Sequence, residues 1–315
     1  MELFLSTFNM TVPIFIVVFV GYVLKRFNMV PESLAGPLNT LAFNVLYPCL
    51  CIKQLQTTNM SMEYLWMGLY AIITFLISIP ILCRIVPKFI PERAKAGVVV
   101  QGSFRSNSIL FAMSLMISVC GEENAGPIMV MVAVATLLFN SMAVIVLSHF
   151  SETGAGADVS PVKTIVKIFK NPLIVGTLVG IILRVMPIEI PNFIMTPINN
   201  LATSGTPVAM LAIGLSFDFK SISKNLKAIG IATMNKLVIM PLVWTVVGYL
   251  IGFRSYILFA IFIEHACPGA SAGVPMADAM GCDGKLAGEI LLVQTLCASV
   301  TIFIGVYIIR FLGII

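Results

Sequence analysis

The sequence predicts an all-α membrane protein with ten transmembrane helices, arranged as two inverted five-helix repeats. Of the 315 residues, 59% are hydrophobic and only 10% are charged, whereas soluble domains carry about 25% charged residues. Apolar runs long enough to cross a bilayer recur along the whole chain, and the second half repeats the first at a constant offset. Lipid is therefore the expected solvent of most side chains.

The apolar runs are each about 20 residues long, which is the length that a helix needs to span the hydrocarbon core. Gly, Pro and charged residues separate them. The centres of the ten runs lie near Phe19, Phe43, Ile73, Ser108, Leu138, Gly180, Met210, Pro241, Ala266 and Thr301.

The basic residues predict the orientation of the ten helices. Thirteen of them fall in alternate loops, which are the first, third, fifth, seventh and ninth. They are Lys25, Arg26, Arg84, Lys88, Arg93, Lys95, Lys163, Lys167, Lys170, Lys220, Lys224, Lys227 and Lys285. Since loops rich in Lys and Arg stay in the cytoplasm, both termini are expected outside it. The net charge of +5 is thus a topology signal and does not predict nucleic-acid binding.

The two halves repeat each other at an offset of 159 to 161 residues. Residues 13–21 match residues 172–180, Pro48 matches Pro207, and Arg93 matches Arg254. Each half holds an odd number of helices, so the second copy must enter the membrane from the opposite side. We therefore expect an N-terminal repeat at residues 1–150, a cytoplasmic linker at 151–168 and a C-terminal repeat at 169–315. The Gly, Ala and Ser content of residues 151–161 is typical of a linker.

Two segments in matching places interrupt the apolar pattern. Residues 101–107 (QGSFRSN) break the fourth run, and residues 264–275 (EHACPGASAGVP) break the ninth. Arg105 and Glu264 each lie about ten residues, or roughly 15 Å, into their helices, which enter the membrane from opposite faces. Both charges should sit near the middle of the bilayer, where each costs at least about 3 kcal/mol. Paired broken helices of this kind indicate a transport site at the midplane.

The residues around the breaks are candidates for binding an anion. The guanidinium of Arg105 matches the geometry of a carboxylate, and opened helix ends would add bare N–H groups. Pro268 breaks its helix because it lacks an N–H. The expected substrate-binding residues here are Arg105, Ser106, Asn107, Ser108, Pro268 and Gly269. The alternative is that Arg105 forms an ion pair with Glu264 that only stabilises the fold.

Glu264, His265 and Lys236 are candidates for ion or proton coupling. A buried carboxylate beside an imidazole can exchange a proton near neutral pH. The alternatives are that Glu264 and His265 form a satisfied neutral pair, and that Lys236 extends its amine to the cytoplasmic surface.

Two further groups of polar residues and prolines are equivalent under the repeat. Asn44 and Pro48 lie in the second run, and Thr203 and Pro207 lie in the seventh. Proline and a polar side chain on one turn either line a cavity or kink a packing helix. We expect these four residues to contribute to substrate binding.

Other polar residues and motifs are less informative. Gln294, Thr295 and Asn140 could add hydrogen bonds to the site, and the alternative, which is the commoner case, is that they only join helices. The sequence contains no Walker A, HExxH, GxSxG or EF-hand motif, and the seven cysteines have no metal-binding spacing. We therefore expect no enzymatic activity, no cofactor and no metal.

Several short motifs resemble the auxin efflux carrier family, which includes bacterial malate- and malonate-type permeases and the plant PIN carriers. They are residues 171–180 (NPLIVGTLVG), 207–214 (PVAMLAIG) and 236–241 (KLVIMP), together with the break at Pro268. The resemblance implies a scaffold of helices 1, 2, 6 and 7 and a moving transport domain of helices 3–5 and 8–10. It also implies that helices 4 and 9 cross at the site, that the cargo is an organic anion, and that the scaffold forms a homodimer. Asn107 stands where the family commonly has a proline.

These observations predict a secondary transporter for a small carboxylate, located in the cell membrane and working by alternating access, with proton coupling through Glu264 and His265. Two alternatives remain. One is a sodium-coupled symporter of the bile-acid type, in which Glu264 and groups near Ser271 hold Na⁺. The other is a membrane sensor or anchor that keeps the fold without transport. The expected partners are the organic anion and the lipid bilayer, and no nucleic acid.

Overall fold

The computed structural model describes residues 2–57, 62–151, 172–186, 190–215, 225–270 and 273–315. Throughout this part of the chain the regular structure is helical, and it contains no β-strand. All ten predicted centres fall on helical residues. The predicted linker lies outside the described residues, apart from Ser151.

The first half contains two π-helical turns, Ala42–Leu46 and Ser108–Ala112. The α-helices are α1 (Glu2–Arg26), α2 (Ala35–Leu41), α3 (Tyr47–Thr57), α4 (Met62–Phe89), α5 (Arg93–Phe104), α6 (Met113–Cys120) and α7 (Gly126–Phe150). The turn Ala42–Leu46 joins α2 to α3, and Ser108–Ala112 leads into α6.

The helices of the second half also include a π-helical turn, η6 (Asn235–Ile239), which joins two α-helices into one rod. The α-helices are α9 (Pro172–Val185), α10 (Asn192–Leu215), α11 (Leu226–Met234), α12 (Met240–Ile251), α13 (Ser255–Ala266), α14 (Gly273–Ala279) and α15 (Gly284–Phe311).

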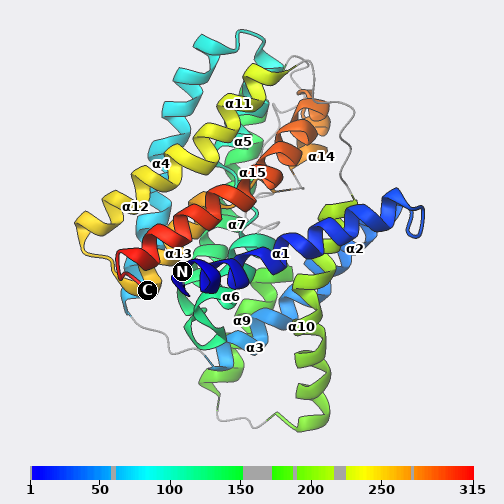
Figure 1. Cartoon of the computed structure of the whole chain (residues 1–315), viewed down its shortest axis with the longest axis vertical. Helices are drawn as coiled ribbons and strands as arrows, with labels where there is room; N and C mark the ends of the chain where they lie inside the picture. The colour runs from blue at the N-terminus through cyan, green and yellow to red at the C-terminus, as the bar shows by residue number, and fades with distance from the viewer. Residues whose placement is uncertain (1, 58–61, 152–171, 187–189, 216–224, 271–272) are drawn as a thin grey trace.

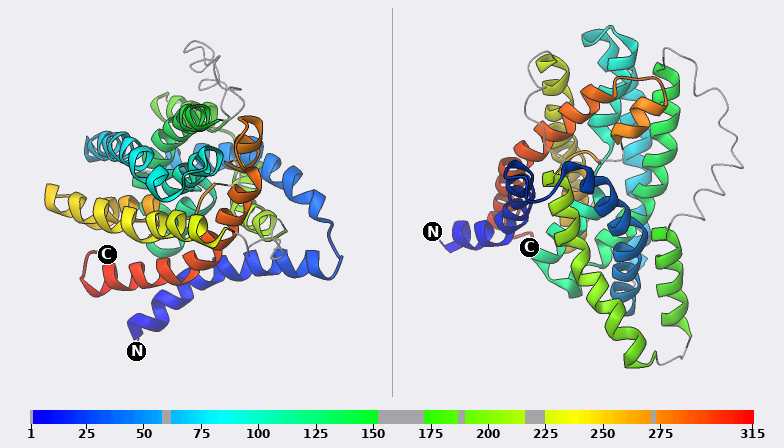
Figure 2. Two further views of the ribbon diagram at one scale, coloured as in Figure 1. Left: turned by 90° about the horizontal axis from the view of Figure 1, so that it is seen from above. Right: turned by 90° about the vertical axis from the view of Figure 1, so that its right-hand side faces the viewer.

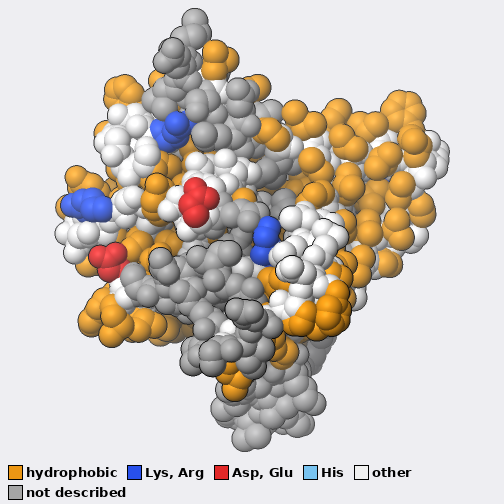
Figure 3. Space-filling model, turned by 90° about the horizontal axis from the view of Figure 1, so that it is seen from below, with side chains coloured by type: hydrophobic (Ala, Val, Ile, Leu, Met, Phe, Trp, Pro, Cys, Tyr) orange, Lys and Arg blue, Asp and Glu red, His pale blue; other side chains and the backbone are white. Residues whose placement is uncertain are grey.

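Four helical stretches among the described residues are long and apolar enough to cross a membrane by themselves. They are Glu32–Lys53, Met62–Phe89, Leu226–Ile251 and Gly284–Phe311. Large hydrophobic side chains remain exposed along many helices, and on the face seen in Figure 3 hydrophobic side chains gather on the right-hand side, while the charged side chains drawn there lie toward the middle and left. Exposed apolar surface of this extent fits a lipid environment. The protein is a multi-pass membrane protein.

Two groups of helices are visible in the fold (Figure 1). In one, α1 packs along α10 and α3 packs along α9. In the other, α4, α5 and α7 pack on one another, α12 packs on α13, and α15 contacts α5 and α11. The groups meet where α1 contacts α15 and α6, and the two further views show α1 and α15 side by side (Figure 2).

Glycines allow α1 and α10 to approach closely. A Cβ on Gly214 of α10 would lie only 2.8 Å from the backbone N of Tyr22 and 2.9 Å from the Cα of Gly21. Such contacts are too short for any side chain, so the two backbones touch directly, as small residues permit in membrane helices.

Candidate functional site

Both predicted interruptions are present, and they meet in space. Helix α5 ends at Phe104, and the backbone is extended at Arg105 before the next helical turn starts at Ser108. Helix α13 ends at Ala266, where the chain again becomes extended at Cys267. The backbone N–H of Asn107 donates to the carbonyl of Pro268 at 2.8 Å. The helix therefore opens at Asn107 without a proline, because a carbonyl from the other break takes its N–H.

The carbonyls released by the Pro268 break are bound by side chains of other helices. In an unbroken helix the carbonyl of Glu264 would accept from residue 268, but proline has no N–H. The Ser106 hydroxyl donates to this carbonyl instead. The carbonyl of His265 loses its helical partner too, and it accepts from Nζ of Lys236 at 3.0 Å. Lys236 also donates to Oγ of Ser106.

Gln294 of α15 binds backbone groups at both breaks. Its Oε1 accepts from the N–H of Gly269 at 2.9 Å, and its Nε2 donates to the carbonyl of Gly102 at 2.9 Å. Nε2 also lies 3.2 Å from the carbonyl of Ala232 on α11. Gln294 is fully buried. One amide therefore connects the broken helices to α11 and α15.

The Glu264 carboxylate is fully buried at the junction of the two breaks. Oε1 accepts from the Ser108 hydroxyl at 2.5 Å. Among the described residues, no hydrogen-bond donor reaches Oε2. A buried polar atom without a partner costs about 1–3 kcal/mol, so the second oxygen is a position where a proton would bind favourably.

His265 is held by three neighbours. Its ring stacks on Phe75 with centroids 4.9 Å apart. Nδ1 lies 2.8 Å from the carbonyl of Ile261, and since a carbonyl only accepts, Nδ1 carries a hydrogen. Nε2 lies 3.3 Å from Oγ1 of Thr74. This hydroxyl donates to the carbonyl of Ala71 at 2.9 Å, so it can accept from a protonated ring, or it can turn away from Ala71 and donate to a neutral ring. The surroundings thus accommodate both protonation states.

A pocket lies beside the breaks, between α5, α14 and α15. It is half-enclosed, and the empty space of about 300 Å³ around it includes open solvent, so the enclosed part of the pocket is much smaller. Arg105 is the only charged side chain among its described lining residues. They are Val98, Gln101, Gly102, Arg105, Gly269, Ala270, Gly273, Val274, Ala287, Ile290, Leu291 and Gln294. The pocket is therefore cationic and rich in amide groups.

Arg105 and Glu264 do not pair with each other. Their side chains form no ion pair within 4.0 Å, although both are described. Nη1 of Arg105 contacts the carbonyl of Phe139 and Sδ of Met276, at 3.5 and 3.2 Å. The interpretation in which Arg105 and Glu264 form a structural ion pair is wrong for this conformation.

Lys236 does not reach the cytoplasmic surface, so that interpretation is wrong too. Its side chain is fully buried. It lies in the middle of the rod Leu226–Ile251, on the π-helical turn, and points at the breaks through its bonds to Ser106 and His265.

The four residues predicted from the second and seventh runs do not line this pocket. Asn44, Thr203 and Pro207 are exposed on the α1–α3, α9 and α10 group, and the Thr203 hydroxyl donates to two carbonyls of its own helix, at 3.0 and 3.1 Å. Pro48 packs against Gly176 of α9, where an added Cβ would lie 2.7 Å from the Cα of Pro48. In this conformation Pro48 serves helix packing.

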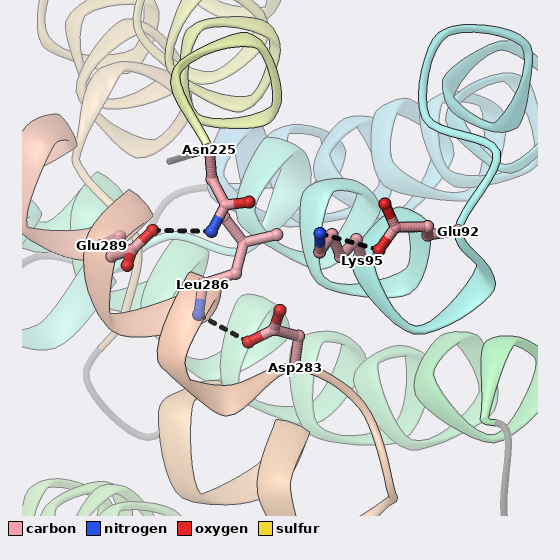
Figure 4. Close-up of polar contacts among 6 residues, drawn as sticks. All are labelled: Glu92, Lys95, Asn225, Asp283, Leu286 and Glu289. Carbon is pink, nitrogen blue, oxygen red and sulfur yellow. Dashed lines mark hydrogen bonds and ion pairs between the residues drawn. The ribbon is translucent and has the colours of Figure 1, made fainter. Parts of the chain in front are cut away.

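Charged and polar residues surround the ends of α5, α11 and α15 close to the pocket (Figure 4). Nδ2 of Asn225 donates to Oε2 of Glu289 at 3.0 Å, and Asp283 caps α15 by accepting from the N–H of Leu286 at 2.9 Å. Lys95 pairs with Glu92 at 2.7 Å. Glu289 was not predicted as a site residue, since it is one polar residue in an apolar run, and Gln101 was placed in the predicted break at residues 101–107 but not among the substrate-binding residues.

The fold and the buried polar junction define a class: helical membrane proteins with a polar site between broken helices. A sequence model of the family described as "membrane transport protein" matches residues 6–306. The chain belongs to this family, which is the auxin efflux carrier family, and is a membrane transport protein.

Two archaeal relatives cover almost the whole chain. An uncharacterized transporter of Methanothermobacter thermautotrophicus is 21% identical over 314 residues, which cover 95% of this chain and 97% of the relative. An uncharacterized transporter of Methanocaldococcus jannaschii is 24% identical over 292 residues, covering 90% and 92% of the two chains. Their names agree with a transporter and specify no substrate.

Proposed function

We propose that the protein is a secondary active transporter of a small organic carboxylate, and that it works by alternating access. The observation that carries the proposal is the pocket beside the two breaks, in which Arg105 is the one charged lining residue among those described. A guanidinium binds a carboxylate through two parallel hydrogen bonds. The limited volume of the pocket favours a small acid.

Gln101 supplies a second donor for the same anion. Its side chain is 3% exposed and lines the pocket. Its Nε2 finds no hydrogen-bond acceptor among the described residues. A carboxylate between Arg105 and Gln101 would accept from both, which removes the cost of leaving the amide unpaired. The absence of a second cation among the described lining residues favours one bound carboxylate group per site.

The architecture that we propose is two inverted five-helix repeats, residues 1–150 and 169–315, with ten spans. Three observations support it: the breaks occur at equivalent places in the two halves, each follows a 12-residue helix, and α1 packs on α10 as α3 packs on α9. We assign α1–α3, α9 and α10 to a scaffold and the remaining helices to a moving transport domain. The proposal places the protein in the cell membrane, with both termini outside the cytoplasm, as a dimer through the scaffold.

Proton coupling is proposed for Glu264 and His265. Two observations support it: among the described residues no donor reaches Oε2 of Glu264, and in the contact between His265 and Thr74 either group can be the donor. Ser106, Asn107, Ser108, Pro268 and Gly269 would shape the junction, while Asn44, Pro48, Thr203 and Pro207 would face the substrate only in a conformation other than this one.

Counterflow into liposomes tests the proposal. Liposomes that contain the purified protein are preloaded with one unlabelled acid from a panel of mono- and dicarboxylates. They should accumulate the labelled form of the same acid when it is added outside. Arg105→Ala should weaken binding by about 30-fold or more, because losing one partner of a buried charged hydrogen bond costs at least about 2 kcal/mol. Arg26→Ala, which changes an exposed arginine at the end of α1, is the matched control.

Each outcome has a defined meaning. Saturable counterflow that Arg105→Ala leaves unchanged would remove Arg105 from the substrate site. Binding of an acid without counterflow would support the sensor or anchor instead of a transporter.

A further inference from the structure

Lys236 has an unusual environment for a lysine in a membrane helix. Its side chain is buried from both water and lipid, with an exposed fraction of 0%. Burying an ammonium group is costly unless oxygens surround it. Here the oxygens are the hydroxyl of Ser106 and the carbonyl of His265, from two different helices. The helix carries Lys236 on a π-helical turn, a distortion that often occurs at functional sites.

The groups that hold Lys236 are the kind that bind small metal cations. Backbone carbonyls, hydroxyls and carboxylates are the ligands of hard cations in proteins. The His265 carbonyl is available only because the Pro268 break releases it, and the Glu264 carboxylate is fully buried at the same break, one residue before His265. Broken helices in transporters commonly present such carbonyls to a coupling ion. In this chain the ammonium of Lys236 already occupies them.

We propose that Lys236 is a tethered cation that takes the place of a coupling sodium ion at the two breaks, so that the protein neither binds nor requires Na⁺ there. The inference rests on the proposed function because it concerns the coupling of that transport site. It counts against the sodium-coupled alternative on a structural ground, since a bound Na⁺ and the ammonium would compete for the same oxygens.

Removing the side chain should convert the tethered cation into a vacant site. Lys236→Ala would delete three methylene groups and the ammonium, leaving the Ser106 hydroxyl and the His265 carbonyl without their donor. Propylammonium has the same three carbons and one nitrogen, so it should fill the vacancy and restore both hydrogen bonds. Choline is too bulky and cannot donate from its nitrogen.

The test is thermal unfolding of the full chain in detergent, without any carboxylate. Wild-type protein should have the same Tm in sodium, potassium and choline chloride at matched ionic strength. Lys236→Ala should unfold several degrees lower, and propylammonium or Na⁺ should raise its Tm saturably while choline does not. Lys227→Ala, an exposed lysine on the same rod, should respond to none of them.

A saturable rise in the wild-type Tm with Na⁺ would overturn the proposal. So would a folded Lys236→Ala protein whose Tm responds to neither propylammonium nor Na⁺. The wild-type measurement decides the question even if Lys236→Ala does not fold. Because no substrate is present, a failure to observe carboxylate counterflow leaves these results unaffected, and the two proposals fail separately.

Discussion

Gln294 shows how much of the site depends on one uncharged residue. Its amide satisfies the Gly269 N–H and the Gly102 carbonyl, which lie at different breaks. Buried backbone groups must find partners, and groups freed from a helix inside a membrane cannot obtain them from lipid. Gln294 therefore replaces two of the hydrogen bonds that unbroken helices would make internally.

We predict that Gln294→Leu destabilises the protein strongly. The change preserves approximate volume but leaves at least two buried backbone groups unpaired, at about 1–3 kcal/mol each. Thermal unfolding in detergent measures the effect. Thr295→Val is the matched control, because among the described residues the Thr295 hydroxyl binds the carbonyl of Leu291 on its own helix and no group of either break. Equal stability of the two variants would show that Gln294 does not hold the breaks.

At this scale the sequence identified the charged residues of the site but not their partners. Arg105, Lys236 and Glu264 stand out because ionisable residues are rare in apolar runs. That Lys236 binds Ser106, 130 residues away, depends on how the helices rotate and pack. Neither periodicity nor composition contains that information, which is why the sequence left open whether Arg105 pairs with Glu264 and whether Lys236 reaches the surface.

The helix breaks could be predicted at the scale of elements, since Pro, Gly and charge together interrupt an apolar pattern. The opening at Asn107 had a weaker local signal, because the residue that takes its N–H is Pro268, in the other half of the chain. The π-helical turns at Ala42, Ser108 and Asn235 had no sequence signal. One inserted residue in a helix changes neither the composition nor the apolar character of the run.

The crossing of α1 and α10 gives a prediction at the same scale. Gly214→Ala should lower the Tm, because its Cβ would meet the backbone at Tyr22 and Gly21, and two rigid helices would have to separate. Thermal unfolding checks it against Gly230→Ala on α11, where nothing lies within 4 Å of the new Cβ. Gly230→Ala should be neutral or stabilise by up to about 1 kcal/mol through helix propensity. A Gly214→Ala protein as stable as Gly230→Ala would contradict direct backbone contact.

The orientation of the whole molecule is a prediction from the distribution of basic residues. In Figure 1 both termini lie in the same region of the fold. A reporter protein fused to the C-terminus, in a bacterium that has a periplasm, should therefore lie outside the cytoplasm. Alkaline phosphatase should be active there, and green fluorescent protein should be dark. A fusion placed within residues 152–171 should give the opposite pair of signals. Bright fluorescence at the C-terminus would reverse the assignment of every loop.

The fixed position of Lys236 also has a consequence for the direction of transport. An ammonium that stays attached to its helix cannot be released on the far side of the membrane, so the sodium gradient can do no work through it. If one negative charge crosses with the substrate, the membrane voltage supplies about 2.3 kcal/mol per 100 mV, which is about 50-fold in concentration. With the cell interior negative, that force pushes an unaccompanied organic anion outward, so import of the acid would require the protons that Glu264 and His265 are proposed to carry.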